Sequence, residues 1–196
     1  FNIRKVGGVY AYLPFFIKNW KIMACLLTKG RGLPCKTGVG GIKAVFFVDY
    51  GGLGALTTSA GEVSGFGGSP TLMKFDVKGN STLDTTVTSS RENGTTFYES
   101  SLVLNLTFQE KETSEEIKLL AVSRPQIIVA DYNGNFFLIG EKNGAELTSG
   151  SFSGGAAMGD LFGYSLTFAT TEQDPPLFVQ KTVMDGATEG TQITPN

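Results

Sequence analysis

The sequence predicts a mainly β protein of the α+β class, an antiparallel β-sandwich or partly closed barrel with one flanking α-helix and a long extended hairpin. Three observations predict this fold. Glycine accounts for 26 of the 196 residues, which favours turn-rich β structure. Several segments alternate apolar and polar residues with the period of a strand, and Asn-Gly dipeptides separate some of them. The order of strands, one helix and further strands is typical of antiparallel α+β domains.

The first strand-like patterns lie between residues 42 and 89, on either side of a segment without periodicity. "IKAVFFVDY", residues 42–50, has the length and the β-branched and aromatic content of a strand. Residues 59–70 show no such pattern and are expected to be flexible. Strand-like alternation then covers residues 72–89. Its apolar rows are Met73, Phe75 and Val77, which alternate with Lys74, Asp76 and Lys78, and then Leu83, Thr85 and Val87, which alternate with Thr82, Asp84 and Thr86.

The longest predicted strand covers residues 95–109. Asn93-Gly94 is a hairpin turn signal, so this strand is expected to pair with residues 72–89. Its length of about 15 residues far exceeds the usual 5–6, which indicates a hairpin that extends beyond one domain's core. The row expected to face protein is Tyr98, Leu102, Leu104, Leu106 and Phe108, and the row expected to face outward is Glu99, Ser101, Asn105 and Thr107.

A single helix and more strands complete the prediction. Thr113 and Glu116 fit a capping box, and Arg124-Pro125 ends the helix. Its apolar stripe consists of Ile117, Leu120 and Ala121. Asn133-Gly134 joins the strands "QIIVADY" and "NFFLIGE". "LFGYSLTFAT" is a further strand, with Phe162, Tyr164, Leu166 and Phe168 on one face, and residues 177–183 form a possible last strand.

Three segments are expected along the chain: an N-terminal extension of residues 1–22, a β domain of residues 23–185 and a C-terminal tail of residues 186–196. The extension is basic and aromatic without periodicity, and Met23 resembles a natural start, so residues 1–22 are interpreted as an N-terminal extension or as translated upstream sequence that is not native. The alternative is a signal peptide with a lipobox at Cys25, but polar residues separate that cysteine from the apolar run. We therefore expect the extension to add little to the fold. Cys25 and Cys35 are expected to be reduced thiols.

The motifs that resemble functional sites are incomplete. The chain has no histidine, which excludes imidazole-based catalysis and imidazole metal sites, and its net charge of −2 argues against sequence-independent nucleic-acid binding. Residues 30–36 lack the second glycine of a P-loop, because Cys35 stands there. "DYNGN" begins like a calcium loop, but Phe136 and Lys142 occupy the required glycine and glutamate positions, so a tight hairpin is the better interpretation.

Two further patterns have structural interpretations. The acidic residues near the helix start are expected to form a solvated face: Glu110, Glu112, Glu115 and Glu116. In the glycine-rich segment "SGSFSGGAAMGD", residues 149–160, Phe152 stands where a hydrolase elbow needs its serine. These small residues are expected to allow close backbone packing or to form a loop that folds against a neighbour. The sequence thus predicts no catalytic, cofactor or metal site, and a protein that is not an enzyme.

Two long runs carry a resemblance to a known family. "MACLLTKGRGLPCKTGVGGIKAVFFVDY" and "NGNFFLIGEKNGAELTSGSFSGGAAMGDLFGYSLTFATTEQDPPLFV" resemble the start and the C-terminal half of major tail tube proteins of tailed phages, particularly Bacteroidetes-type and uncultured phages. The resemblance covers most of residues 23–179. It implies a β-sandwich or barrel with one flanking helix, six copies per ring, and rings stacked into a hollow tube through which DNA passes without specific binding.

The resemblance also implies partners and a location. The expected partners are other copies of the chain, further tail proteins (tape measure, tail terminator, and baseplate or tip), and genomic DNA in the lumen, without a membrane. The expected location is the virion tail, after assembly in the host cytoplasm. The long hairpin would line the lumen, and the residues expected at the subunit interface are Met73, Phe75, Val77, Leu102, Leu104 and Leu106. The alternative function is a secreted or lipid-anchored β-sandwich surface protein of the adhesin type.

Overall fold

The computed structural model describes residues 29–33, 35–77 and 80–193. The chain divides into two compact units, Phe1–Lys36 and Thr37–Asn196. The described residues of the first unit are exposed and contain no helix or strand. The predicted N-terminal extension of residues 1–22 and the cysteine at position 25 lie outside the described residues.

The second unit is mainly β, with two sheets that are not closed into a barrel and two helices. One sheet has eight strands in the order β12-β4-β1-β7-β8-β11-β3-β2, and the other has four in the order β5-β6-β10-β9. The strands of the first sheet are β1 (Ile42–Val48), β2 (Thr57–Ser59), β3 (Glu62–Gly65), β4 (Thr71–Asp76), β7 (Gln126–Asp131), β8 (Phe136–Ile139), β11 (Leu177–Val179) and β12 (Thr188–Glu189). Those of the second are β5 (Thr82–Ser90), β6 (Thr95–Thr107), β9 (Glu146–Ser153) and β10 (Gly163–Glu172). The sandwich-like α+β class predicted from the sequence is therefore confirmed.

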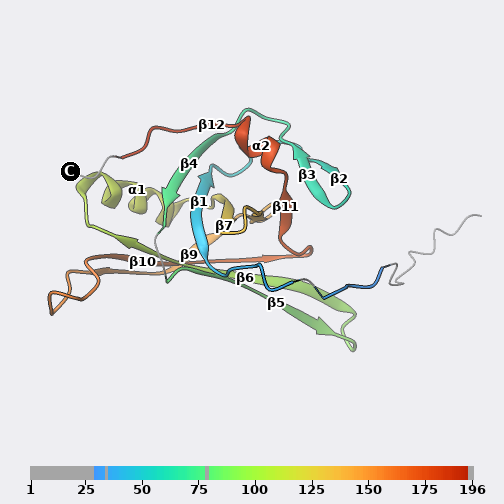
Figure 1. Cartoon of the computed structure of the whole chain (residues 1–196), viewed down its shortest axis with the longest axis horizontal. Helices are drawn as coiled ribbons and strands as arrows, with labels where there is room; N and C mark the ends of the chain where they lie inside the picture. Colours follow the sequence, from blue (N-terminus) through green and yellow to red (C-terminus); the bar gives the residue numbers. More distant parts are fainter. Residues whose placement is uncertain (1–28, 34, 78–79, 194–196) are drawn as a thin grey trace, which may run out of the picture. The chain divides into compact units, whose positions relative to one another are not determined.

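The two sheets form stacked layers, and their strands cross steeply (Figure 1). The four-stranded sheet consists of two antiparallel hairpins, β5–β6 and β9–β10, joined by pairing of β6 with β10. The turn of β5–β6 and the loop of β9–β10 lie at opposite ends of this sheet (Figure 1). Gly94 in the first turn has φ +63°, a conformation that glycine adopts without steric cost.

The second unit has two apolar cores, one between the two sheets and one on the outer face of the eight-stranded sheet. The inter-sheet core lies between the sheets, and its largest fully buried side chains include Leu104, Leu166 and Phe168. Alternation along each strand supplies it, because every second side chain of β1, β6, β7 and β10 points to the same side. The outer core lies on the opposite face of the eight-stranded sheet, where Leu53, Val63 and Met184 cover β1 and β7. β1 and β7 are therefore buried on both faces.

Both helices lie beside the sheets. α1 (Lys111–Val122) buries Ile117 in the inter-sheet core, and the hydroxyl of Ser114 bonds to Tyr164 Oη at 2.7 Å. The expected capping box is wrong: Thr113 lies within the first turn, the N-cap is Glu110, and its side chain makes no capping hydrogen bond. Of the predicted stripe, Ala121 is exposed. The helix does end before Arg124-Pro125. α2 (Lys181–Asp185) is a second helix where the sequence predicted one only.

The strand pairing differs from the prediction in one important respect. Residues 72–89 are not one partner of the long strand: β4 pairs with β1 in the eight-stranded sheet, and only β5 pairs with β6. β6 also ends at Thr107, because Phe108 has φ +71° and is 62% exposed. The same period-two pattern continues on both sides of residues 78–81 and predicts a single strand partner, but the chain changes sheets between β4 and β5.

Smaller differences concern the loops and the C-terminus. Residues 59–70, expected to be flexible, contain β3, which pairs with β2 on one side and with β11 on the other. The last strand was predicted for residues 177–183. The observed strand β11 ends at Val179, and residues 181–185 form the helix α2. β12, within the predicted C-terminal tail, pairs in parallel with β4. β9 was not predicted.

Candidate assembly surface

The four-stranded sheet has one face that no other element of the second unit covers. We call it the polar face. Strand registers place its side chains in rows across the sheet, such as Asp84–Ser101–Ala169 and Thr86–Glu99–Thr171. None of its residues is buried. They are Thr82, Asp84, Thr86 and Thr88 of β5, Phe97, Glu99, Ser101, Val103 and Asn105 of β6, Ser149, Ser151 and Ser153 of β9, and Ser165, Thr167, Ala169 and Thr171 of β10.

The charge of this sheet has a single sign. β5, β6, β9 and β10 contain no lysine and no arginine, and all four strands lie within the described residues. Their acidic residues are Asp84 and Glu99 on the polar face, Glu146 at the start of β9, and Glu172, which is buried. The sequence prediction that Asp84 and Glu99 face outward is confirmed. Asn105 also lies on this face, but its Nδ2 donates a hydrogen bond to the Asn80 carbonyl at 2.6 Å, so it is partly buried.

The edge strands of the two sheets differ in length. The eight-stranded sheet ends in β12 and β2, which have two and three residues. Short edge strands are a common protection against pairing with another chain. The four-stranded sheet ends in β5 and β9, with nine and eight residues and one charged side chain each. β9 has one register irregularity against β10, and β5 has none against β6. These two edges present long rows of backbone groups that can pair with another strand.

Most residues expected at the subunit interface lie elsewhere. Leu102 and Leu104 are fully buried, Val77 is 6% exposed and Leu106 is 7% exposed, all within the inter-sheet core. Packing inside the subunit therefore accounts for these four side chains. Phe75 is partly buried, with its ring edge-on to Phe47 at 5.1 Å between centroids. Met73 is 45% exposed and lies on β4. Most of these six residues therefore lie close together, but in the inter-sheet core of one copy of the chain.

The glycine- and serine-rich segment that precedes β10 has a structural role. Residues 146–153 form β9, and Gly150 lies opposite Leu166, where an added Cβ would approach the Leu166 side chain to 3.3 Å. In the following loop, the carboxylate of Asp160 accepts hydrogen bonds from the backbone N–H groups of Ala157 and Ala156 at 2.8 and 2.9 Å, which lower its pKa. The segment is a strand and an ordered loop. The signal for β9 was weak because serine and glycine replace the usual apolar row.

The loop between β8 and β9 is held by carboxylates. Glu172 Oε1 accepts hydrogen bonds from the backbone N–H groups of Lys142 at 2.7 Å and Asn143 at 3.4 Å, while Lys142 Nζ forms an ion pair with Asp174. Burial raises the pKa of the nearby Glu141, with Lys142 opposing this effect and Glu172 and Asp174 adding to it. The arrangement fixes the loop against the end of β10.

The "DYNGN" loop is a hairpin turn, as the sequence indicated. The Asp131 carboxylate accepts hydrogen bonds from the Asn135 backbone N–H at 2.7 Å and from the side-chain amides of Asn135 and Asn133 at 2.9 and 3.1 Å. Burial alone would raise the pKa of Asp131, but these hydrogen bonds outweigh it and lower the pKa. Gly134 has φ +82°. The oxygens are thus engaged within the loop.

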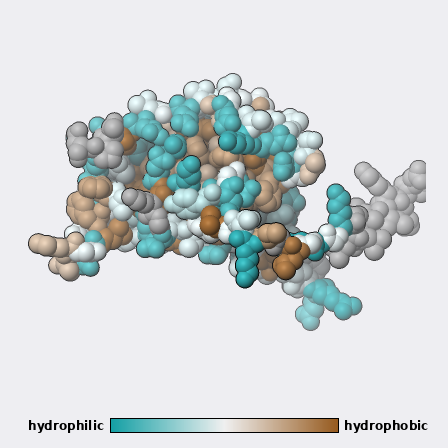
Figure 2. Space-filling view, in the orientation of Figure 1, coloured by the Kyte–Doolittle hydropathy of each residue, from teal (hydrophilic) through white to brown (hydrophobic). Residues whose placement is uncertain are grey.

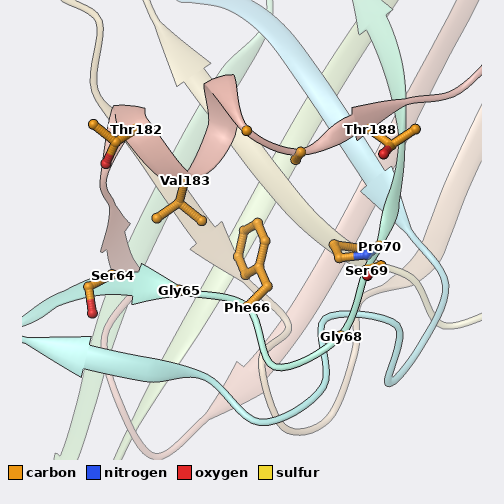
Figure 3. Close-up of a pocket in the computed structure, with 11 residues that line it drawn as sticks. Ser64, Gly65, Phe66, Gly68, Ser69, Pro70, Thr182, Val183 and Thr188 are labelled. Carbon is orange, nitrogen blue, oxygen red and sulfur yellow. The ribbon is translucent and has the colours of Figure 1, made fainter.

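The described part of the second unit has at least four hollows. One of them, of about 370 Å³, lies between the β3–β4 segment and the α2–β12 segment, with the ring of Phe66 and the side chain of Val183 pointing into it (Figure 3). Its lining residues are all uncharged. Another, which we call the cleft, has about 680 Å³ and lies where the β5 edge and the eight-stranded sheet diverge. On the face of the molecule shown in Figure 2, hydrophilic residues are interspersed with small apolar areas.

Searches for other features and for relatives gave no assignment. In residues 29–33, 35–77 and 80–193, no group of three or more histidine, cysteine, aspartate or glutamate side chains is placed to hold a metal ion. Neither helix in this part of the chain combines the length and apolar character needed to cross a membrane. Comparison of the chain with family models, curated proteins and solved structures finds no match.

Proposed function

We propose that the protein is a structural subunit of a phage tail tube, which self-assembles into hexameric rings that stack around a lumen for DNA. The observation that carries this proposal is the four-stranded sheet, with two long open edges and a polar face that has acidic but no basic residues. The family resemblance of the sequence supplies the number of copies and the nature of the cargo. The partners proposed are further copies and other tail proteins, and the location is the virion tail.

The strand directions are compatible with a closed ring. β5, β6, β10 and β9 alternate in direction across the sheet, since each neighbouring pair is antiparallel. Pairing of β9 in one subunit with β5 in the next would therefore continue the antiparallel alternation without interruption. Contacts of this heterologous kind form rings when the rotation between subunits closes. Closure would leave no open edge in the sheet, which removes the aggregation hazard of two exposed long strands.

The dimensions of such a ring suit the proposed cargo. Four strands from each of six subunits, spaced about 4.8 Å apart and tilted by about 40°, give a barrel about 50 Å across between backbones. Side chains on the inner face reduce this width, yet the remaining lumen accommodates a DNA duplex. If the polar face lines the lumen, Asp84 and Glu99 give it negative charge, and the small hydroxyl side chains offer DNA no cationic contact.

Sedimentation and electron microscopy of the full-length protein test the proposal. We expect rings or tubes at high concentration. If the protein stays monomeric and no rings appear, the tube proposal fails and the secreted or lipid-anchored β-sandwich takes its place. The intact mass of the natural protein then separates the two directly, because a diacylglyceryl group on the cysteine at position 25 belongs only to the anchored protein.

A pair of proline variants tests the β5 edge. In an antiparallel ladder, alternate residues are hydrogen-bonded to the partner strand, so one of two adjacent β5 residues directs its N–H to β6 and the other to the open edge. Thr85→Pro and Thr86→Pro are therefore a matched pair, in which each variant is the control for the other. We expect one variant to lose the β5–β6 ladder. The other is expected to keep its circular dichroism spectrum and to lose the rings, and rings formed by that folded variant would exclude β5 from the interface.

A further inference from the structure

The cleft combines apolar walls with an acidic rim. On one side, Phe137 and Phe178 of the eight-stranded sheet are packed together at 4.8 Å between ring centroids, and Phe178 is 45% exposed. On the other side, Leu83 and Val87 of β5 line the cleft, with Val87 59% exposed. Its volume of about 680 Å³ lies in the range of binding pockets.

All charge in the cleft is negative. The only charged residues that line it are Asp84 and Asp131. Charge is also distributed unevenly along the whole chain. Seven of the sixteen basic residues and none of the eighteen acidic residues lie in residues 1–36, so residues 37–196 carry nine basic and eighteen acidic residues.

The sequence of residues 1–22 complements this cleft. It has four basic residues and no acidic one, together with six aromatic residues. Tryptophan, tyrosine and arginine side chains are those that most often anchor protein interfaces, and the segment contains Arg4, Tyr10, Tyr12 and Trp20. Gly41 and Ile42, where the second unit begins its first strand, line the cleft, and the 18 residues between positions 22 and 41 reach about 60 Å when extended. The proposed ring places neighbouring subunits about 25 Å apart at the barrel, because each contributes four tilted strands. The segment is therefore long enough to reach a neighbour.

We propose that the cleft binds residues 1–22 of a neighbouring copy of the chain. This inference rests on the proposed function, since the cleft is lined by Thr82 to Thr85 and Val87 of β5, the edge assigned to subunit pairing. A basic segment that crosses from one acidic subunit to the next places positive charge between like charges that otherwise repel. The aromatic side chains contact the apolar walls, and the basic side chains lie near two carboxylates at the rim of the cleft: Asp84, which belongs to the polar-face row of β5, and Asp131, which is held within the β7–β8 turn.

Photo-cross-linking of the full-length protein tests the contact. The photoreactive residue p-benzoylphenylalanine replaces Trp20 in unlabelled protein, which is mixed with ¹⁵N-labelled protein before irradiation, and cross-linked peptides are identified by mass spectrometry. We expect unlabelled-to-labelled cross-links to peptides containing residues 82–87 or 175–178. Cross-links within one chain only, or to other surfaces, overturn the inference. A small apolar molecule retained in native mass spectra, without cross-links to the cleft, assigns the cleft to a ligand instead.

Matched charge variants give a second measurement. Val87→Lys introduces a positive charge on the cleft wall, and Thr86→Lys introduces the same charge on the adjacent residue, which faces the other side of β5. Because the segment is basic, we expect Val87→Lys to reduce the cross-links at least fivefold and Thr86→Lys to leave them within twofold of wild type. Equal yields in the two variants contradict the inference. Rings with cross-links elsewhere refute this inference alone, whereas cross-links between chains at the cleft without rings refute the tube proposal.

Discussion

Replacement of Leu104 by alanine distinguishes a role of this side chain in the core from a role in a subunit interface. Leu104 lies in the middle of β6, opposite Leu166 of β10, and is fully buried in the inter-sheet core. Truncation of a buried leucine to alanine costs about 2–5 kcal/mol, and full burial between two sheets places Leu104 near the middle of that range, at about 4 kcal/mol. For a chain of this size, each kcal/mol lowers the melting temperature by about 2–4 °C, so we expect a decrease of about 8–16 °C.

The adjacent residue provides the control for this measurement. Val103 lies on the polar face and is only partly buried, with Thr82 and Thr167 as its cross-strand neighbours. Val103→Ala removes a similar kind of side chain from the same strand without opening a cavity in the core. We expect it to change the melting temperature by about 3 °C or less, which corresponds to about 1 kcal/mol. Both variants are measured by thermal unfolding followed by circular dichroism.

The result that refutes this reasoning is a melting temperature of Leu104→Ala within 2 °C of wild type together with loss of rings. It would place Leu104 in the subunit interface, as the sequence predicts. Leu104→Asp is accordingly expected to unfold the subunit and to stop assembly for that reason. Asn105→Asp is expected to assemble, because Asn105 lies on the polar face, although the variant loses the donor that bonds to the Asn80 carbonyl.

Three further predictions concern the chain ends, the β7–β8 turn and metals. A protein that starts at Met23 is expected to melt cooperatively within about 5 °C of the full chain, and a larger decrease would show that residues 1–22 stabilise the fold. Asp131→Ala is expected to lower the melting temperature at pH 7. Because the folded-state pKa of Asp131 lies below its ordinary value of 3.8, its contribution is fully present above that value and is lost as the pH falls through the folded-state pKa. The difference between Asp131→Ala and wild type should therefore narrow in acid, and a constant difference from pH 7 to pH 2 would contradict the assignment. Elemental analysis of the purified protein is expected to find neither zinc nor calcium in stoichiometric amounts.

Local patterns in the sequence were sufficient to identify many of the elements. β1, β6, β7, β8 and β10 were predicted near their observed positions. Alternation of apolar and polar residues reflects the geometry of a single strand, and it does not depend on the partner strand. The turns at Asn93-Gly94 and Asn133-Gly134 were predicted for a similar reason, because glycine favours the left-handed backbone of a tight turn wherever it occurs.

The polar face was also visible in part. Asp84 and Glu99 were expected to face outward from the alternation of their strands, and they do. The absence of basic residues from the four strands is a property of the sequence as well, but it became apparent only when the structure placed β5, β6, β9 and β10 in one sheet. β9 carried almost no periodic signal of its own, and its pairing with β10 defines it.

Which sheet each strand joins, and what each apolar row contacts, was decided only by the tertiary structure. Residues 72–89 continue one period-two pattern, yet β4 and β5 belong to different sheets. Leu102, Leu104 and Leu106 form the apolar row that the sequence predicted, but their partners are the strands of their own subunit. Alternation specifies that one face of a strand is buried, and it carries no information on the surface that buries it. That surface is set by contacts between residues far apart in the chain, which form only when the two sheets pack.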